Sequence, residues 1–203
     1  MLVGIYAIVD PGLTERPLEL LEALLAGGVR VVQYRAKAGV EREVVRAMHL
    51  RTRAQGAALI VNDDFEAALE ADGWHAGQED LVGRDVGELR RRLGGRLFGV
   101  SCGVAQEALV AAAFGADYVG TGPFAATTTK ADAGPAIGAA GLRAVVAATR
   151  LPVVAIGGID SANLDEVARS GARMAAVASA FARAADPQAL AAELVMRWRA
   201  VAA

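Results

Sequence analysis

The regular alternation of short apolar runs with longer stretches of helical period constrains the fold of this 203-residue chain more than any other feature. The apolar runs predict eight strands, at residues 4–10, 29–35, 58–62, 73–76, 97–101, 116–121, 152–157 and 174–179. The segments between and after them predict helices at residues 17–26, 41–55, 65–71, 85–93, 105–114, 139–149, 162–170 and 187–201. Such alternation is typical of βα units around a parallel sheet that is buried on both faces.

Eight βα units predict the α/β class and a single (β/α)8 TIM barrel that spans residues 1–203 as one domain. Eight parallel strands can close on themselves, and closure removes both edges of the sheet. An open, doubly wound sheet is the alternative. Against it, the segment VDPGLTERP after the first strand holds one glycine, so the chain lacks a glycine-rich dinucleotide-binding motif there.

Composition limits the surroundings and partners of the chain. Hydrophobic residues make up 54% of it, yet no run approaches the ~18 apolar residues of a transmembrane helix. The start, MLVGIYAIVD, lacks a secretory signal, and the one cysteine, Cys102, allows no internal disulfide. A formal net charge of -2 provides no basic field for nucleic acid. We therefore expect a cytoplasmic protein that acts on small molecules, with neither nucleic acid nor membrane as partner.

Polar side chains gather where the second predicted strand ends. The C-terminal strand ends of a barrel form the rim that carries the active site. Gln33, Arg35 and Lys37 alternate there, so their side chains face the same way. A strand face covered by helices has no place for two cations, so we expect these side chains to point into the barrel mouth. Surface ion pairs or helix capping are the alternative for the two cations.

Carboxylates end the third strand and follow the fourth. Asn62 and Asp63 close one strand, and Asp80 follows its neighbour. Two carboxylates and an amide that face two cations form either an acid/base pair or a site for a hard cation. We favour Mg²⁺, which takes one or two carboxylates and completes its shell with water and phosphate oxygens. Helix capping is the alternative for each carboxylate, and it is the preferred interpretation of Asp64.

Hydroxyl groups and an ammonium group gather on the loop after the sixth predicted strand. They belong to Thr127, Thr128, Thr129 and Lys130. Such groups on a long loop suit a bound phosphate. Ser101, at the end of the fifth strand, adds another hydroxyl to the same rim.

Small residues end the last two strands. Gly157 and Gly158 follow the seventh strand, and Ala178 and Ser179 end the eighth. Barrels often bind a phosphate at this position through backbone N–H groups. A tight turn that needs glycine is the alternative for the glycine pair. His75, inside the fourth strand, is better explained as a satisfied interior residue than as a catalyst, and Cys102 as a buried apolar residue.

Seven motifs in order resemble those of the thiamine phosphate synthase (thiamine-phosphate pyrophosphorylase) family over nearly the whole chain. They are VQYRAK, IVNDD, GWHAGQED, GVS, the GPFAATTTK loop, AIGGI and the final VAS. The resemblance implies a transferase of thiamine biosynthesis. Its reaction condenses 4-amino-2-methyl-5-hydroxymethylpyrimidine diphosphate with 4-methyl-5-hydroxyethylthiazole phosphate, giving thiamine phosphate and pyrophosphate.

The resemblance also implies a role for each matching residue. Asp63 and Asp80 would hold Mg²⁺. The residues expected to bind the pyrimidine diphosphate are Gln33, Arg35, Lys37, Asn62, Ser101 and Lys130. Those expected to bind the thiazole phosphate are Thr127, Thr129, Gly158, Ala178 and Ser179, with Thr128 counted among the substrate-binding residues. Catalysis is expected from Arg35, Lys37, Ser101 and Lys130.

The chain departs from the family pattern at two places. Ala125 and Ala126 replace a proline and a bulky apolar residue before the threonines. Tyr34 and Ala36 flank the cations where leucine or phenylalanine and an acidic residue are commoner, so we expect an acidic partner for Arg35 or Lys37 to be missing. Two alternatives to the synthase stay open: a thiazole tautomerase-like isomerase on the same barrel, and a non-catalytic phosphate-ligand binding protein. By family habit a homodimer is also expected.

Overall fold

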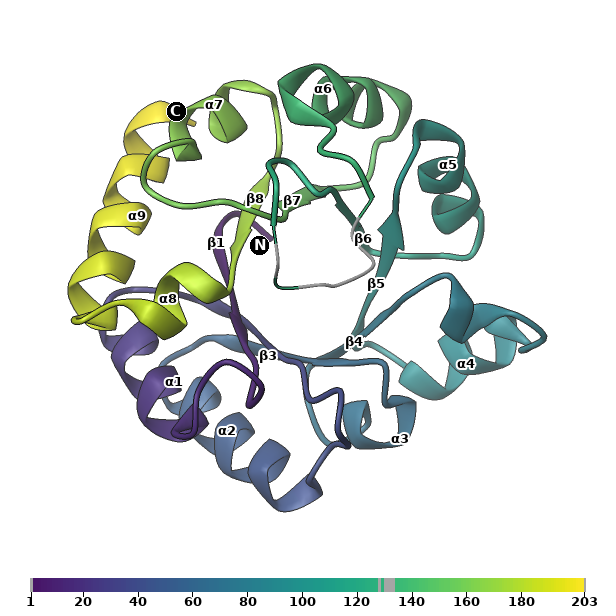
Figure 1. The fold of residues 1–203 in the computed structure, drawn as a ribbon. Helices are drawn as coiled ribbons and strands as arrows, with labels where there is room; N and C mark the ends of the chain where they lie inside the picture. Colours follow the sequence, from purple (N-terminus) through teal and green to yellow (C-terminus); the bar gives the residue numbers. More distant parts are fainter. Residues whose placement is uncertain (1, 128, 130–133, 203) are drawn as a thin grey trace.

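A computed structural model describes residues 2–127, 129 and 134–202, and in it eight parallel strands close into a barrel in chain order (Figure 1). The strands are β1 Gly4–Val9, β2 Val31–Tyr34, β3 Ala58–Asn62, β4 Gly73–Ala76, β5 Leu97–Cys102, β6 Tyr118–Thr121, β7 Val153–Ile156 and β8 Met174–Val177. Strand β8 pairs with β1 in parallel, with Gly4 opposite Met174, and this pairing closes the sheet. The predicted (β/α)8 TIM barrel is confirmed.

Helices surround the barrel on its outer side (Figure 1). They are α1 Pro17–Ala26, α2 Arg42–Ala54, α3 Phe65–Ala68, α4 Val86–Leu93, α5 Ala105–Ala113, α6 Gly138–Ala148, α7 Leu164–Arg169, α8 Ser179–Arg183 and α9 Pro187–Val201, with a single 3-10 turn η1 at Glu79–Leu81. Helix α8 was not predicted, and the eighth strand ends before Ser179 instead of including it. A helix of five residues is too short to show a 3.6-residue period in the sequence.

Local sequence signals explain where several helices begin. Pro17 and Pro187 occupy the first turns of α1 and α9. Backbone N–H groups in the first turn have no acceptor within the helix, so proline, which lacks this N–H, is tolerated there. Asp64 caps α3, because its side chain accepts a hydrogen bond of 2.9 Å from the Ala67 N–H. The preferred interpretation of Asp64 as a helix cap is therefore confirmed.

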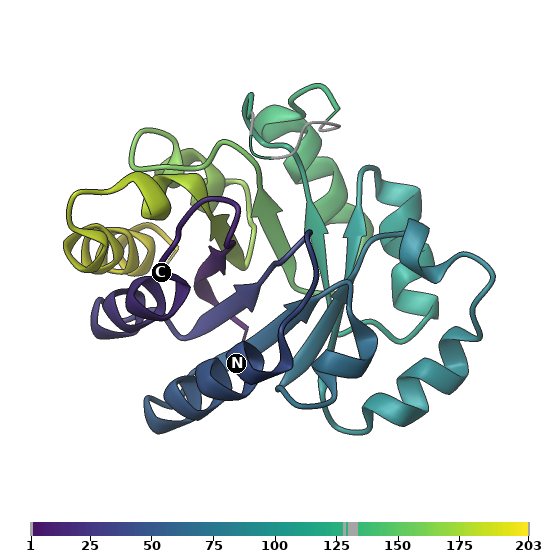
Figure 2. The same cartoon turned by 60° about the horizontal axis from the view of Figure 1, so that its bottom comes forward.

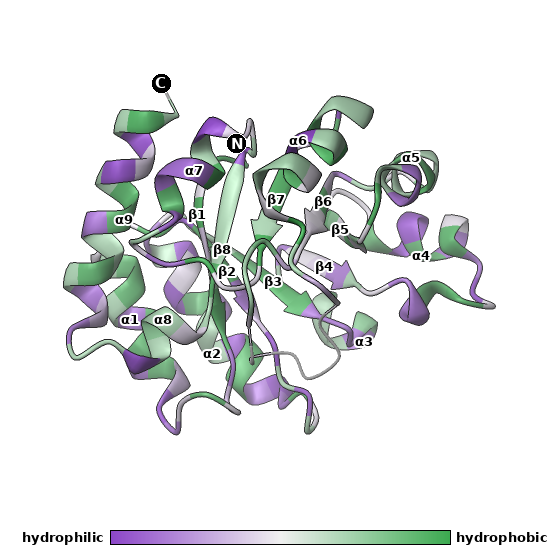
Figure 3. Ribbon diagram, turned by 45° about the horizontal axis from the view of Figure 1, so that its top comes forward, coloured by the Kyte–Doolittle hydropathy of each residue, from purple (hydrophilic) through white to green (hydrophobic). Residues whose placement is uncertain are grey.

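The two faces of the sheet pack differently. The outer face and the helices form the large apolar core, in which Trp74 stacks on Phe98 with ring centroids 5.3 Å apart. The inner face forms a smaller buried cluster of Tyr6, Ile8, Val31, Ile60, Tyr118, Val154, Met174 and Ala176. Hydrophobic residues dominate β3, β7 and β8 in Figure 3, whereas α9 alternates hydrophobic and hydrophilic residues. Burial on both faces explains why the strands are continuous apolar runs in the sequence.

All strands run toward one end of the barrel, where the loop between β6 and α6 also lies (Figure 2). The C-terminal strand ends therefore share a rim, as the strand-end analysis requires. Among the described residues, no helix has the length and hydropathy needed to cross a membrane.

Candidate active site

A cavity of about 470 Å³ opens at the C-terminal rim and receives residues from all eight strands or the loops that follow them. The predicted site residues that line it are Gln33, Arg35, Lys37, Asn62, Asp63, Ser101, Thr127, Thr129, Gly158, Ala178 and Ser179. Asp80 does not line the cavity. Thr128 and Lys130 lie outside the described residues. The strand-end positions thus converge on one hollow although they are spread over most of the chain.

Both cations of β2 and its extension have carboxylate partners. The Arg35 guanidinium lies 2.5 Å from the carboxylate of Asp10, and both side chains are largely buried. The Lys37 ammonium lies 2.5 Å from the carboxylate of Asp63 in a more exposed pair. The expectation that an acidic partner is missing is therefore wrong, because the partners come from neighbouring strands rather than from position 36.

Asp10 is a site residue that the sequence analysis missed. It follows β1 directly, is buried and lines the cavity. Its second carboxylate oxygen accepts a hydrogen bond of 2.8 Å from the Gly12 N–H, which fixes the side chain in the turn after β1. Its position at the end of the first predicted strand was the signal, since the same rule identified the polar residues of the other strands.

The backbone of Asp63 is held in an unusual conformation. Asp63 has φ +62°, and it is the single non-glycine residue with positive φ in the described part of the chain. The Asp63 N–H donates to the His75 carbonyl at 2.9 Å, and the Trp74 indole N–H donates to the Asp63 carbonyl at 3.0 Å. A left-handed aspartate held from both sides is typical of a functional position, since such conformations cost about 1–3 kcal/mol.

Asp80 lies on the turn η1, and its carboxyl group neighbours that of Asp63. Its carboxylate accepts a hydrogen bond of 2.7 Å from the Gly77 N–H. Burial raises the pKa of Asp80, and the neighbouring charge of Asp63 raises it further, while the hydrogen bond from Gly77 opposes the shift. Two adjacent carboxylates repel each other unless a cation or a proton lies between them.

This carboxylate pair fits a hard cation such as Mg²⁺. Oxygen ligands from one or two carboxylates are the donors that Mg²⁺ takes from proteins. Within the described residues, no group of three or more His, Cys, Asp or Glu side chains could hold a metal. Asp63 and Asp80 are the two neighbouring carboxylates that would hold such an ion.

A chain of hydrogen bonds joins five residues that line the cavity inside the barrel. Gln33 Nε2 donates to the Tyr6 hydroxyl at 3.0 Å, and the Tyr6 and Tyr118 hydroxyls lie 2.9 Å apart. His75 Nδ1 lies 3.1 Å from the Tyr118 hydroxyl, and His75 Nε2 lies 3.0 Å from the Ser101 hydroxyl. Burial lowers the pKa of His75 to about 4, so the imidazole is neutral near pH 7. His75 is therefore buried with a partner at each ring nitrogen, as expected, and it also lines the cavity.

Glycines shape the opposite side of the cavity. Gly157 and Gly158 have φ +94° and +65°. A Cβ at Gly158 would lie 2.7 Å from the Ala126 carbonyl oxygen, and one at Gly157 would lie 2.6 Å from Pro123 Cβ. Glycine is thus required here by backbone conformation and by the close approach of the β6–α6 loop. The turn explanation for this pair is correct, and both residues also line the cavity.

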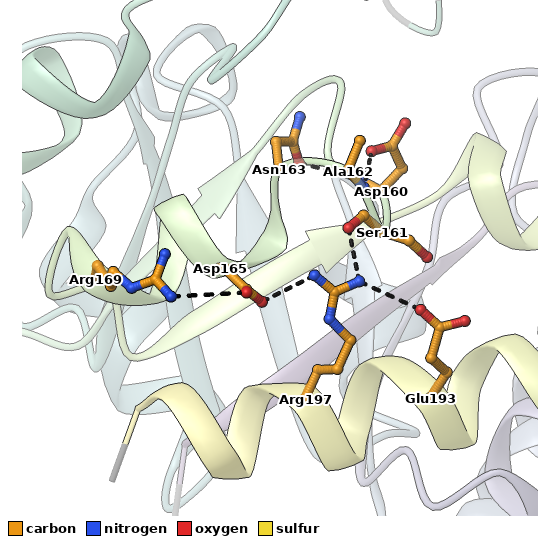
Figure 4. A network of polar contacts seen from close by, with 8 residues as sticks. All are labelled: Asp160, Ser161, Ala162, Asn163, Asp165, Arg169, Glu193 and Arg197. Carbon is orange, nitrogen blue, oxygen red and sulfur yellow. Dashed lines mark hydrogen bonds and ion pairs between the residues drawn. The ribbon is translucent and has the colours of Figure 1, made fainter.

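Polar contacts brace the β7–α7 loop from outside (Figure 4). Arg197 on α9 donates to the Ser161 carbonyl at 2.7 Å and pairs with Asp165 on α7 at 3.0 Å. The Asn163 amide donates to the Gly158 carbonyl at 2.7 Å. These contacts hold the loop in place and so fix the position of the Gly158 backbone at the cavity wall.

Cys102 is buried, as expected. Its side chain packs in the outer core, and burial raises the pKa of its thiol to about 12. A thiol with so high a pKa is a poor nucleophile near pH 7.

A (β/α)8 barrel with cations and paired carboxylates on one side of its C-terminal mouth and glycine turns on the other defines the class of TIM-barrel enzymes that act on phosphorylated small molecules. Within that class, the chain belongs to the thiamine monophosphate synthase family, whose model matches residues 5–181.

Curated relatives and a solved structure agree with this membership. The chain is 45% identical to the thiamine-phosphate synthase of Chloroflexus aurantiacus over 94% of its own length and 90% of the relative's. It is 46% identical to that of Moorella thermoacetica, over 87% of this chain and 86% of the relative. The solved thiamine phosphate pyrophosphorylase from Pyrococcus furiosus is 31% identical, with a TM-score of 0.89 over 99% of this chain and 98% of that chain. The predicted family is confirmed.

Proposed function

We propose that this protein joins the pyrimidine diphosphate to the thiazole phosphate and releases pyrophosphate. The observation that carries the proposal is the composition of one cavity: Arg35, Lys37 and Asp63 lie on its β2–β3 side, and the Gly157–Gly158 turn forms its β7 side. Two phosphorylated substrates need two separate anion sites. Family membership and relatives named thiamine-phosphate synthase support the same reaction.

Departure of pyrophosphate is the step that the charged side serves. The bond between the pyrimidine methylene carbon and the diphosphate oxygen breaks, and its electron pair leaves with the oxygen. The amino-substituted ring releases electrons toward the methylene carbon, so no nucleophile from the protein is needed. Arg35, Lys37 and Lys130 stabilise the negative charge that grows on the leaving group, and each such interaction contributes ~3–4 kcal/mol.

Magnesium would add to this stabilisation. Mg²⁺ held by Asp63 and Asp80 would supply positive charge that stabilises the departing diphosphate. In its absence the two carboxylates repel the same oxygens, with Lys37 as the neutralising partner of Asp63. The donor set of two neighbouring carboxylates supports this role.

Attack by the thiazole nitrogen is the step that the glycine side serves. The nitrogen lone pair forms a bond to the methylene carbon as the diphosphate departs. The groups proposed to hold the thiazole phosphate are Thr127, Thr128, Thr129, Gly158, Ala178 and Ser179. Holding the acceptor in line converts the encounter of two substrates into a step within one complex, which is the positioning contribution to catalysis.

The carboxylate pair distinguishes this reaction from its alternatives. A tautomerase-like isomerase acts on one thiazole phosphate by acid/base catalysis and has no use for a metal-bound diphosphate. A non-catalytic binding protein would need the phosphate cradle without the carboxylates. The arrangement of Asp63 beside Asp80, with Lys37 paired to Asp63, favours the synthase.

A pyrophosphate-release assay tests the proposal. The purified protein receives both phosphorylated substrates with Mg²⁺, and parallel reactions omit one substrate or replace Mg²⁺ by a chelator. We expect stoichiometric pyrophosphate and thiamine phosphate in the complete reaction alone. Isomerisation of the thiazole phosphate without pyrophosphate release would identify the tautomerase instead.

A further inference from the structure

The hydrogen-bonded chain inside the barrel joins residues of five different strands. We call the set Gln33, Tyr6, Tyr118, His75 and Ser101 the interior chain. Tyr6 and Tyr118 are 2% and 0% exposed, so both are buried, and together with His75 they line the cavity. Gln33 and Ser101, at the two ends, both line the cavity. The interior chain therefore runs along the wall of the cavity from Gln33 to Ser101.

The barrel makes room for this chain at a glycine. A Cβ at Gly99 would lie 2.1 Å from Tyr118 Cζ and 2.5 Å from His75 Nδ1. The backbone of Gly99 does not have a positive φ, so its conformation does not require glycine. A side chain at position 99 would occupy the space in which Tyr118 contacts His75. Glycine at this position therefore makes room for the interior chain.

Counting protons shows which group donates in each hydrogen bond of the interior chain. An amide nitrogen can only donate, so the Tyr6 oxygen accepts from Gln33 Nε2. Each hydroxyl has one proton, and a buried hydroxyl proton without an acceptor is unfavourable. Tyr6 therefore donates to Tyr118, which is the other polar group within hydrogen-bond distance of its hydroxyl among the described residues.

The same count continues to the far end. Tyr118 has accepted from Tyr6, so it donates its own proton to His75 Nδ1. A neutral imidazole carries one proton, which must then be on Nε2. His75 Nε2 donates to the Ser101 oxygen, and the Ser101 proton is left free to point into the cavity.

We propose that His75 is a positioning residue whose tautomer, set from Gln33 through the two tyrosines, makes Ser101 a hydrogen-bond donor toward the pyrimidine diphosphate. This role rests on the proposed function. With the opposite direction, Ser101 would donate to His75 and present only lone pairs to the cavity. Lone pairs repel diphosphate oxygens, whereas a hydroxyl proton attracts them.

The tautomer can be measured without any substrate. The chain has two histidines, His49 and His75, so a His49→Gln variant leaves a single imidazole for ¹⁵N nuclear magnetic resonance. We expect Nε2 to carry the proton and Nδ1 to be bare in the free protein at pH 7. A proton on Nδ1 would overturn the proposal, because Ser101 would then be the donor to His75.

Removing one hydroxyl group from the interior chain tests whether the tyrosines set the tautomer of His75. Tyr118→Phe deletes the donor to His75 Nδ1, so we expect the second tautomer to appear in the spectrum, and Tyr6→Phe to have the same effect more weakly. Tyr34→Phe is the matched control, because Tyr34 is 2% exposed but belongs to the outer core. An unchanged tautomer in Tyr118→Phe would contradict the relay.

Kinetics then separate this proposal from the proposed function. We expect Tyr118→Phe to lower kcat ~10-fold through misplacement of Ser101, with the KM for thiazole phosphate unchanged. Tyr34→Phe should keep the parent kcat. A kcat unchanged in Tyr118→Phe would remove the catalytic part of the proposal. If no variant and no parent protein released pyrophosphate, the proposed function would fail while the tautomer result stood.

Discussion

The two sides of the barrel mouth are built from different kinds of group. On the β1–β4 side, charged side chains pair across neighbouring strands, as in Arg35 with Asp10 and Lys37 with Asp63. On the β6–β8 side, none of the described cavity-lining residues from Gly122 onward carries a charge. Glycine turns and backbone groups form that wall instead.

The difference corresponds to two ways of holding an anion. Side-chain charges interact strongly with charge that develops during a reaction, which suits a leaving group. Backbone N–H groups are fixed by the fold and suit an anion whose charge does not change. The bracing of the Gly158 carbonyl by Asn163, at 2.7 Å, fits the second mode. We therefore expect substitutions on the charged side to lower kcat and those on the glycine side to raise a single KM.

Asp80→Ala should cause the largest loss of activity among substitutions on the charged side. Loss of one of the two carboxylates removes the proposed Mg²⁺ site, and we expect Mg²⁺-dependent turnover to fall by ~10³-fold. Asp85→Ala is the control, since Asp85 caps α4 through the Glu88 N–H at 2.9 Å. That variant should lose about 1 kcal/mol of stability and keep its kcat. Steady-state kinetics over a Mg²⁺ titration make the measurement, and unchanged kinetics in Asp80→Ala would exclude the ligand role.

Lys130→Ala tests whether a cation from the loop between β6 and α6 serves the charged side. Lys130 lies outside the described residues, so its role comes from the family resemblance. We expect kcat to fall ~100-fold if its ammonium stabilises the leaving group. A higher KM for the thiazole phosphate at constant kcat would instead assign Lys130 to the glycine side.

The interior chain lies between the two sides and should make stability depend on pH. Burial lowers the pKa of His75 from 6.5 to about 4 in the folded protein. Below pH 6.5 the unfolded chain binds a proton that the folded protein does not, so stability falls as the pH decreases. Between pH 7 and pH 5 this loss is about 2 kcal/mol.

Urea unfolding at the two pH values measures this effect. The His75→Gln variant should lose less stability than the parent protein between pH 7 and pH 5, because its side chain does not titrate. Equal pH dependence in both proteins would show that His75 is not buried as a neutral imidazole.

Gly158→Ala should disturb the glycine side alone. Its Cβ would lie 2.7 Å from the Ala126 carbonyl oxygen, and we expect the KM for thiazole phosphate to rise ~10-fold, since small displacements at a binding wall weaken positioning. Gly56→Ala is the matched control, because Gly56 has φ +62° and open space around its Cα. The control should show only the cost of a left-handed alanine, about 1 kcal/mol. An equal change in both KM values would contradict the division of the mouth.

Sequence patterns predicted the site residues whose positions depend on the local sequence of one strand. Strand alternation predicted that Gln33, Arg35 and Lys37 share a face, and the cavity contains all three. The strand-end rule also found Asp63 and Gly158. These features follow from periods of two residues and from the direction of parallel strands, which a single sequence carries.

Those patterns could not predict contacts between strands that are far apart in the sequence. Tyr6 and Tyr118 are 112 positions apart, and nothing in either segment indicates that their hydroxyls meet. An acidic partner of Arg35 or Lys37 was wrongly expected to be missing because position 36 is alanine, whereas Asp10 and Asp63 come from adjacent strands. The positive φ of Asp63 likewise depends on the hydrogen bond from its N–H to the His75 carbonyl and on the one that its carbonyl accepts from Trp74.

Simultaneous binding tests the division of the mouth most directly. Calorimetry would compare the Kd of thiazole phosphate in protein alone and in protein saturated with Mg²⁺ and pyrophosphate. Two separate anion sites predict that both ligands bind together, with the Kd of thiazole phosphate the same or lower in the saturated protein. Mutually exclusive binding, seen as loss of the thiazole phosphate signal, would contradict the account.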